Sequence, residues 1–154
     1  VPQTEPENSR PTRKAALLQL LPLAAMAANA QFNEIGKAFV GHYYQMFDAS
    51  IEQRSTLQSM YQDASMLTFE NEQFMGMQAI MTKLTTLQFQ TVAHQPTTTD
   101  CQPTLNNGIQ VFVTGKLAVD GSPNPLMFSQ SFLLYPTAGG SWYIHNDFFR
   151  LNYS

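Results

Sequence analysis

Residues 65–76 read SMLTFENEQFMG, a segment in which a polar run, ENEQ, separates two apolar runs. Apolar and small polar residues alternate from Met66 to Phe69 as in a strand, and Phe74 resumes the apolar character. The pattern predicts a β-hairpin whose tip carries Phe69 and Glu70. An aromatic side chain beside an acid is a common interface pairing, but a core aromatic followed by a solvated turn gives the same pattern. The hairpin alone leaves both interpretations open.

Helical patterns surround this hairpin. Apolar residues recur at steps of three and four from Phe32 to Phe47, which predicts one amphipathic helix. Residues 50–53 (SIEQ) form a capping box with Ser50 as N-cap, so a second helix is expected there. A third, short helix is expected over about residues 77–87. The side chains expected to be buried on the second helix are Ile51, Leu57, Met60 and Tyr61.

Strand patterns fill the rest of the chain. Gly, Pro and Asn turn signals separate four long apolar or alternating segments. These segments are residues 89–99, 108–119, 126–136 and 141–151. The order α-α-β-β-α-β-β-β-β predicts an α+β fold, in which three helices pack on a curved antiparallel sheet and leave an apolar cavity at its open end. Phe69, Phe89 and Phe149 are candidates for its lining, although plain core positions would satisfy the same pattern.

Composition and charge limit the classes of partner. The chain has 154 residues, of which 44% are hydrophobic and 12% charged, as expected of one folded domain. Its formal net charge is −3, and three of its eight Lys and Arg residues fall within the first fourteen positions. Nucleic-acid binding needs clustered bases, so the acidic remainder favours a basic protein partner and excludes nucleic acid.

The N-terminal segment differs from the rest of the chain. Residues 1–14 have the Pro, Glu, Asn and Ser content of a disordered tail. The following apolar run ends in an A-x-A pattern like that of a secretory signal, and it is too short to span a membrane. An upstream extension, a targeting peptide and a helical appendage all remain open. We expect residues 1–30 to be an extension outside the native core and residues 31–154 to form the domain.

Catalytic and metal-binding signatures are missing from the sequence. It contains no GxGxxG, P-loop, GxSxG, HxxxH or CxxC motif. The histidines are spread over positions 42, 94 and 145, so no metal, cofactor or enzymatic activity is expected. His145 and Asp147 fall on one strand face by the two-residue rule, which leaves a buried dyad or separate structural roles open. Cys101 is expected to be an incidental loop thiol.

Five blocks of sequence together resemble the nuclear transport factor 2 family in their order and spacing. The resemblance covers about residues 31–154. The blocks are HYYQMFD at 42–48, YQDASMLTFENEQFMG at 61–76, FQTVAHQ at 89–95, FSQSFLLYP at 128–136 and NDFFRLNYS at 146–154.

This resemblance implies a non-enzymatic import carrier. Members of the family form homodimers through the curved sheet, bind Ran-GDP and FxFG-repeat nucleoporins, and return Ran to the nucleus. The expected location is therefore the cytoplasm and nucleus, at the nuclear pore and envelope, with no membrane insertion. The residues carried over from the family are Phe69, Glu70, His94 and Asp120 for Ran binding, Phe89 and Phe149 for the cavity, and Phe32 for nucleoporin binding.

Two departures from the family qualify these expectations. Phe69 stands where animal members commonly have tryptophan, and the loop at residues 119–126 keeps only Asp120 where members carry two or more acids. The missing acid predicts weaker electrostatic attraction for Ran. The alternatives are an adaptor of the same fold, such as the small partner of an mRNA export receptor, and a cavity isomerase or dehydratase.

Overall fold

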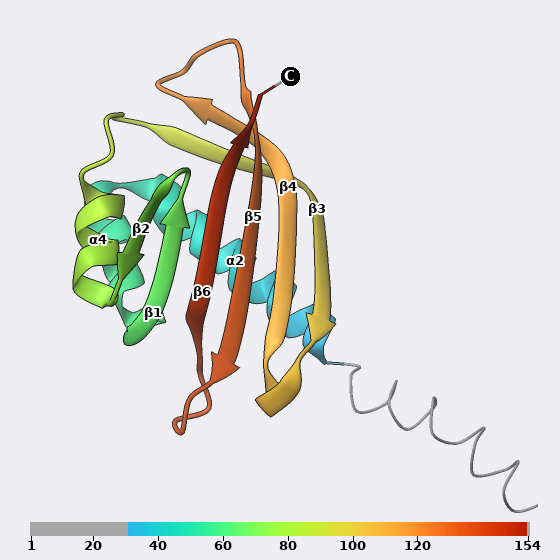
Figure 1. Ribbon diagram of the computed structural model, residues 1–154. Coiled ribbons are helices and arrows are strands. Elements are labelled where there is room, and N and C mark those ends of the chain that lie inside the picture. Colours follow the sequence, from blue (N-terminus) through green and yellow to red (C-terminus); the bar gives the residue numbers. More distant parts are fainter. Residues whose placement is uncertain (1–30, 154) are drawn as a thin grey trace, which may run out of the picture. The chain divides into compact units, whose positions relative to one another are not determined.

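The computed structural model describes residues 31–153, and Figure 1 shows the arrangement of their helices and strands. The expectations for residues 1–30, namely a disordered tail, a targeting peptide or a helical appendage, lie outside the described residues. None of the described helices is long and apolar enough to span a membrane.

Helix α2 (Phe32–Ala49) follows the predicted apolar stripe and covers one face of the sheet. Gly36 lies on its buried side, facing β3 (Val92–Pro103). A Cβ atom at this position would lie 2.6 Å from the Sγ atom of Cys101, so glycine is what allows the close approach. The expectation that Cys101 is a loop thiol was wrong, because it is a buried residue of β3 and burial raises the pKa of its thiol.

The second helical segment is shorter than its sequence pattern predicts. It consists of α3 (Ile51–Ser55) and the 3₁₀ turn η1 (Thr56–Met60). The predicted N-cap is confirmed, since the Gln53 backbone N–H donates to Ser50 Oγ at 3.1 Å. Ile51 is 46% exposed and Tyr61 begins a strand, so neither belongs to a buried helical face as expected.

The predicted third helix is α4 (Met77–Thr85), which buries Ile80 and Leu84 and packs beside the hairpin. The hairpin is confirmed. Strands β1 (Tyr61–Phe69) and β2 (Glu72–Met75) pair antiparallel across a two-residue turn in which Glu70 has a φ of 56°.

The six strands form one curved sheet with the order β2-β1-β6-β5-β4-β3. The remaining strands are β4 (Ile109–Val119), β5 (Leu126–Pro136) and β6 (Trp142–Asn152). All neighbouring pairs are antiparallel except β1 and β6, which run parallel. The predicted α+β fold is confirmed, with this one parallel pair added to the expected antiparallel sheet.

Candidate functional site

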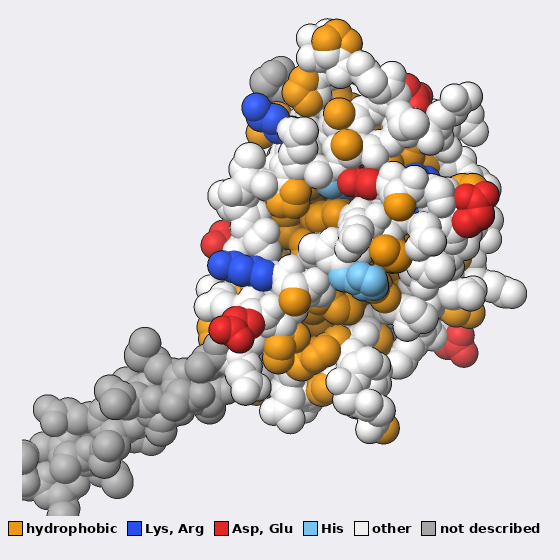
Figure 2. Space-filling view, turned by 180° about the vertical axis from the view of Figure 1, so that it is seen from behind, with side chains coloured by type: hydrophobic (Ala, Val, Ile, Leu, Met, Phe, Trp, Pro, Cys, Tyr) orange, Lys and Arg blue, Asp and Glu red, His pale blue; other side chains and the backbone are white. Residues whose placement is uncertain are grey.

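An apolar cavity of about 250 Å³ lies between the sheet and the helices. Phe69, Phe89 and Phe149, the three aromatic residues expected there, all line it. In the face of the molecule seen in Figure 2, hydrophobic side chains are visible in a hollow with an acidic side chain at its edge. Gln88 and Leu126, which line the cavity, are exposed, so the cavity is open to solvent.

Two stacked aromatic rings form one wall of the cavity. Phe69 and Phe149 are register partners on the parallel strands β1 and β6, and their ring centroids lie 4.8 Å apart at an interplanar angle of 14°. The Nζ atom of Lys83 lies 5.2 Å from the centroid of the Phe69 ring and 2.5 Å from Glu72 Oε2. Sequence reasoning missed Lys83, which holds a positive charge against the ring.

Glu70 is anchored to the end of β6. Its backbone N–H donates to the Phe149 carbonyl at 2.9 Å, and its Oε1 atom accepts from the Leu151 backbone N–H at 2.7 Å. Next to it, Arg150 donates to the Asn71 side-chain oxygen at 2.9 Å, which ties the hairpin turn to the same strand. One oxygen of the Glu70 carboxylate therefore has a fixed position, and the other makes no hydrogen bond to any residue of 31–153.

Asp120 is anchored to the segment that precedes β3. Its Oδ1 atom accepts from the backbone N–H groups of Gln90 and Thr91, both at 2.8 Å. A surface depression lined by Asp120 also includes Leu87 and Phe89, which in turn line the cavity. Asp120 thus lies beside the cavity.

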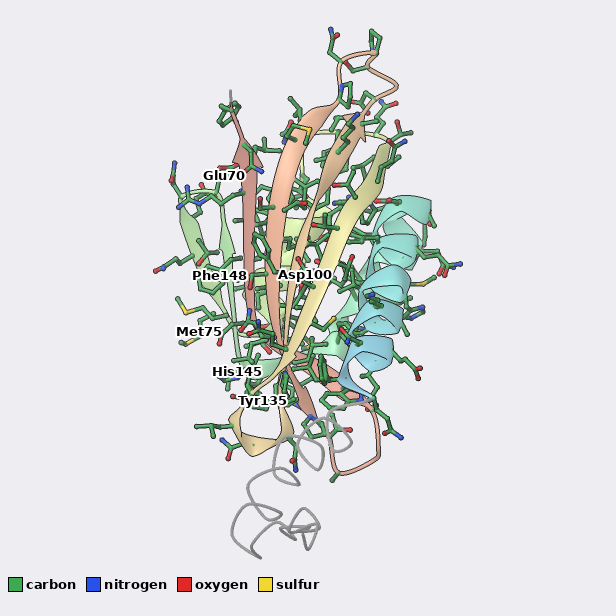
Figure 3. All side chains as sticks on the ribbon, turned by 90° about the vertical axis from the view of Figure 1, so that its right-hand side faces the viewer. Glu70, Met75, Asp100, Tyr135, His145 and Phe148 are labelled. Atoms are coloured by element: carbon green, nitrogen blue, oxygen red, sulfur yellow. The ribbon has the colours of Figure 1, made fainter. Side chains whose placement is uncertain are left out.

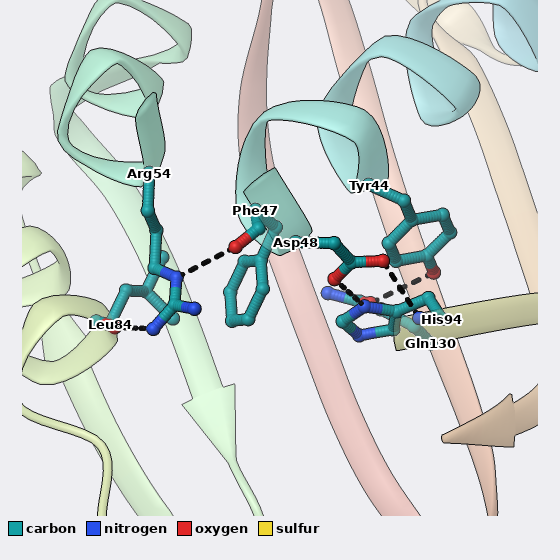
Figure 4. A network of polar contacts seen from close by, with 7 residues as sticks. All are labelled: Tyr44, Phe47, Asp48, Arg54, Leu84, His94 and Gln130. Carbon is teal, nitrogen blue, oxygen red and sulfur yellow. Dashed lines mark hydrogen bonds and ion pairs between the residues drawn. The ribbon is translucent and has the colours of Figure 1, made fainter. Parts of the chain in front are cut away.

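His94 lies inside the cavity wall and pairs with an acid that sequence reasoning missed. Asp48 Oδ1 is 2.6 Å from His94 Nδ1, and Asp48 Oδ2 accepts from the His94 backbone N–H at 2.7 Å (Figure 4). The His94 ring also stacks on Tyr44, with 4.4 Å between centroids. In the sequence Asp48 only marked the point at which the helical stripe stops, and no local signal indicated its partner 46 residues later.

The hypothesis of a dyad between His145 and Asp147 is wrong. The Asp147 carboxylate faces the interior, where it accepts from Tyr61 Oη and Gln130 Nε2, each at 2.8 Å. Opposite this segment the register between β5 and β6 shifts, so that His145 becomes an extra residue and the two-residue rule fails. His145 lies with Tyr135 on the sheet face away from α2 (Figure 3). Burial raises the pKa of Asp147 to about 6.

Arg54 is a third residue, after Lys83 and Asp48, that the sequence patterns did not indicate. It is buried, it donates from Nε to the Phe47 carbonyl at 2.9 Å, and its guanidinium lies 4.4 Å from the Phe47 ring centroid and 5.0 Å from that of Phe89. Burial lowers the pKa of its guanidinium. Arg54 therefore connects the end of α2 to α4, since it also donates to the Leu84 carbonyl (Figure 4).

Phe32 does not lie with the other predicted site residues. It is the first residue of α2, whereas Phe47, near the other end of that helix, lines the cavity. At 1.5 Å per residue the two positions are about 22 Å apart along the helix. No group of three or more His, Cys, Asp or Glu side chains within residues 31–153 is placed to hold a metal ion.

The family model of the nuclear transport factor 2 (NTF2) domain matches residues 35–151, which include the cavity and both anchored acids. The chain belongs to the nuclear transport factor 2 family. Among its relatives, nuclear transport factor 2B of Arabidopsis thaliana is 50% identical over 121 residues, covering 78% of this chain and 94% of the relative.

The fold agrees with solved structures of the family. Nuclear transport factor 2 from Cryptosporidium parvum matches with a TM-score of 0.75 and 48% identity, covering 79% of this chain and 95% of that one. A putative dehydratase of the NTF2-like family from Streptomyces avermitilis matches with a TM-score of 0.67 at only 12% identity, covering 82% of this chain and 99% of that one. The latter likeness shows the fold alone. The close relatives are nuclear transport factors and not enzymes.

Proposed function

We propose that this protein is a nuclear import carrier that binds Ran-GDP and FxFG-repeat nucleoporins and returns Ran to the nucleus. It would move between cytoplasm and nucleus through the nuclear pore. The observation that carries the proposal is an apolar cavity flanked by two acids, Glu70 and Asp120, each of which is held by backbone amides.

The geometry suits a partner that presents an exposed apolar side chain next to basic ones. The cavity would take the apolar group, and the carboxylates would take the bases. Charge-assisted hydrogen bonds of this kind contribute about 1.5–3 kcal/mol each when well formed. Because the backbone amides already fix both acids, little side-chain entropy remains to be lost on binding.

The anchoring of Asp120 also bears on whether the loop at residues 119–126, which lacks a second acid, can still bind a basic partner. Asp120 accepts two backbone hydrogen bonds through Oδ1, and its other oxygen, Oδ2, makes no hydrogen bond to the residues of 31–153. Because its position is fixed, this single carboxylate compensates in part for the attraction that a second, mobile acid would add. We infer that Asp120 is sufficient for binding, with a lower affinity than a two-acid loop would give.

The homodimer would form through the outer face of the sheet. Phe112 and Phe148 flank Ser131 in one row of register partners and are 44% and 52% exposed. Phe148 and the exposed Met75 lie on the face of the sheet away from α2 (Figure 3). Large exposed apolar side chains on one sheet face are typical of an interface.

Nucleoporin repeats would pack against the ring of Phe32.

The test is the affinity for Ran loaded with GDP against Ran loaded with GTP, measured by calorimetry with the purified chain. The proposal predicts saturable binding to Ran-GDP and at least a tenfold weaker interaction with Ran-GTP. Equal affinity for the two forms, or no binding to either, would contradict it. A parallel titration with an mRNA export receptor separates the carrier from an adaptor of the same fold, which would bind the receptor instead.

A further inference from the structure

His94 presents an unused nitrogen to a largely apolar cavity. Its side chain is only 4% exposed, and the ring lines the cavity. Nδ1 is bonded to Asp48, one ring face stacks on Tyr44, and Phe47 and Phe128 make T-shaped contacts with the ring, with centroids at 5.1 and 5.3 Å. Nε2 makes no hydrogen bond to the residues of 31–153, yet it is not among their fully buried unpaired atoms, so the ring edge that carries it faces the cavity that the ring lines.

Asp48 determines what Nε2 can do. A carboxylate only accepts hydrogen bonds, so the Nδ1 atom that faces it carries a proton. In the neutral imidazole the other nitrogen, Nε2, is then an acceptor. Gln130, another polar residue of the wall, already uses its amide, because Oε1 accepts from Tyr44 Oη at 2.9 Å and Nε2 donates to Asp147. The cavity thus offers a directed acceptor within apolar walls.

The volume of the cavity limits the size of an occupant. A cavity of about 150 Å³ is enough to bind benzene, and pockets for drug-sized ligands begin at about 300 Å³. The volume here is about 250 Å³, and Phe47, Phe69 and Phe149 contribute flat apolar surface to it. One aromatic ring or two fused rings fit within these dimensions, and a larger ligand would extend out of the cavity into solvent.

We propose that the cavity is also a small-molecule site, which takes an uncharged aromatic compound of one or two fused rings whose hydroxyl group donates a hydrogen bond to His94 Nε2. The walls supply the apolar contact and His94 supplies the selectivity for a donor. Such a ligand would occupy the space that a protein partner's apolar side chain would enter and would compete with that partner. The competition rests on the proposed function, whereas the binding of the ligand does not.

The experiment compares two probes of equal shape, 2-naphthol and 2-methylnaphthalene, by calorimetry on the full chain without Ran. A net hydrogen bond predicts that 2-naphthol binds about five- to tenfold more tightly. In His94→Asn, the amide can keep the bond to Asp48 but places nothing at the position of Nε2. This variant is expected to bind both probes with equal affinity, which also shows that its cavity is intact. His42→Asn, which changes an exposed histidine of α2, is expected to keep the wild-type preference.

Equal affinities for the two probes in the wild type, an unchanged preference in His94→Asn, or no saturable binding of 2-naphthol would each overturn the proposal. Adding 2-naphthol to a Ran-GDP titration tests the competition separately. If 2-naphthol binds with the expected preference and Ran-GDP does not bind, the proposed function fails and the small-molecule site stands. If Ran-GDP binds and 2-naphthol does not, the site fails and the carrier function stands.

Discussion

The rings of Phe69 and Phe149 stack face to face, with 4.8 Å between centroids, because parallel pairing of β1 and β6 places the two residues opposite each other. Phe149 is buried, whereas Phe69 is partly exposed at the hairpin tip. The buried Phe149 ring therefore contributes mainly to the stability of the fold, and the partly exposed Phe69 ring contributes mainly to the surface of the cavity.

Replacement of each ring by alanine should separate these roles. Phe149→Ala is expected to lower the free energy of unfolding by about 3–5 kcal/mol, as for buried aromatic residues in general. Phe69→Ala should cost less stability, because its ring is already partly in contact with solvent, and should reduce Ran-GDP affinity in a protein that remains folded. Denaturant unfolding and calorimetry measure the two effects. A larger stability loss for Phe69→Ala than for Phe149→Ala would contradict this division.

The contact between Gly36 and Cys101 predicts a specific steric effect. Gly36→Ala places a Cβ atom 2.6 Å from Cys101 Sγ, and overpacking of this kind costs about 1–3 kcal/mol. Gly41→Ala in the same helix meets no atom within 4 Å and should stabilise the protein by up to about 1 kcal/mol through helix propensity. In a Cys101→Ala background the Gly36→Ala penalty should shrink, as denaturant unfolding of the double-mutant cycle would show. An equal penalty with and without Sγ would refute the steric explanation.

Asp147 predicts a pH dependence of stability. Burial raises its pKa from 3.8 to about 6, so between these values the folded state binds more protons than the unfolded state. The contribution of this group to stability is therefore lost as the pH rises from about 4 to about 6. The loss is about 3 kcal/mol at most, since each pKa unit corresponds to about 1.4 kcal/mol.

Asp147→Asn removes this titration and retains groups that can bond to Tyr61 and Gln130. The difference in the free energy of unfolding between the variant and the wild type should change in favour of the variant as the pH rises over this interval. Urea unfolding at pH 4, 5, 6 and 7 measures it. A difference that stays constant with pH would show that Asp147 does not titrate in this range.

The exposed apolar residues on the outer face of the sheet predict a homodimer that an introduced charge would dissociate. Phe148→Glu places a carboxylate at one end of the row formed by Phe112, Ser131 and Phe148 and should convert a homodimer to monomers, which sedimentation equilibrium detects. Ile51→Glu, at a similarly exposed apolar residue of α3, is the matched control and should leave the dimer unchanged. If the wild type is monomeric, or if both variants behave alike, the sheet face is not the interface.

Much of the fold could be predicted from the sequence because its signals are local. The hairpin at residues 65–76 depends on an apolar alternation around a polar turn, and the N-cap Ser50 on a four-residue pattern. The parallel pairing of β1 with β6 depends on segments about 80 residues apart, and no turn signal sets its direction.

The residues of the site fall into the same two groups, those that a sequence signal indicated and those that depend on contacts between distant segments. The cavity aromatics and the two acids were indicated by the order of the sequence blocks, whereas the contact between Asp48 and His94 arises only when α2 packs against β3. The apparent pairing of His145 with Asp147 failed because a register shift at one residue moved His145 to the other face of the sheet. A period-two rule has no means of detecting such a shift.

The most direct measurement of the central claim is the affinity of Glu70→Gln for Ran-GDP. The glutamine Oε1 can still accept from the Leu151 N–H, so the change removes the charge and keeps the anchor. We expect a loss of affinity of about tenfold or more, corresponding to one charge-assisted hydrogen bond, with an unchanged free energy of unfolding. Glu34→Gln, at an exposed acid of α2 far from the cavity, should bind like the wild type. Wild-type affinity in Glu70→Gln would contradict the claim that Glu70 recognises Ran.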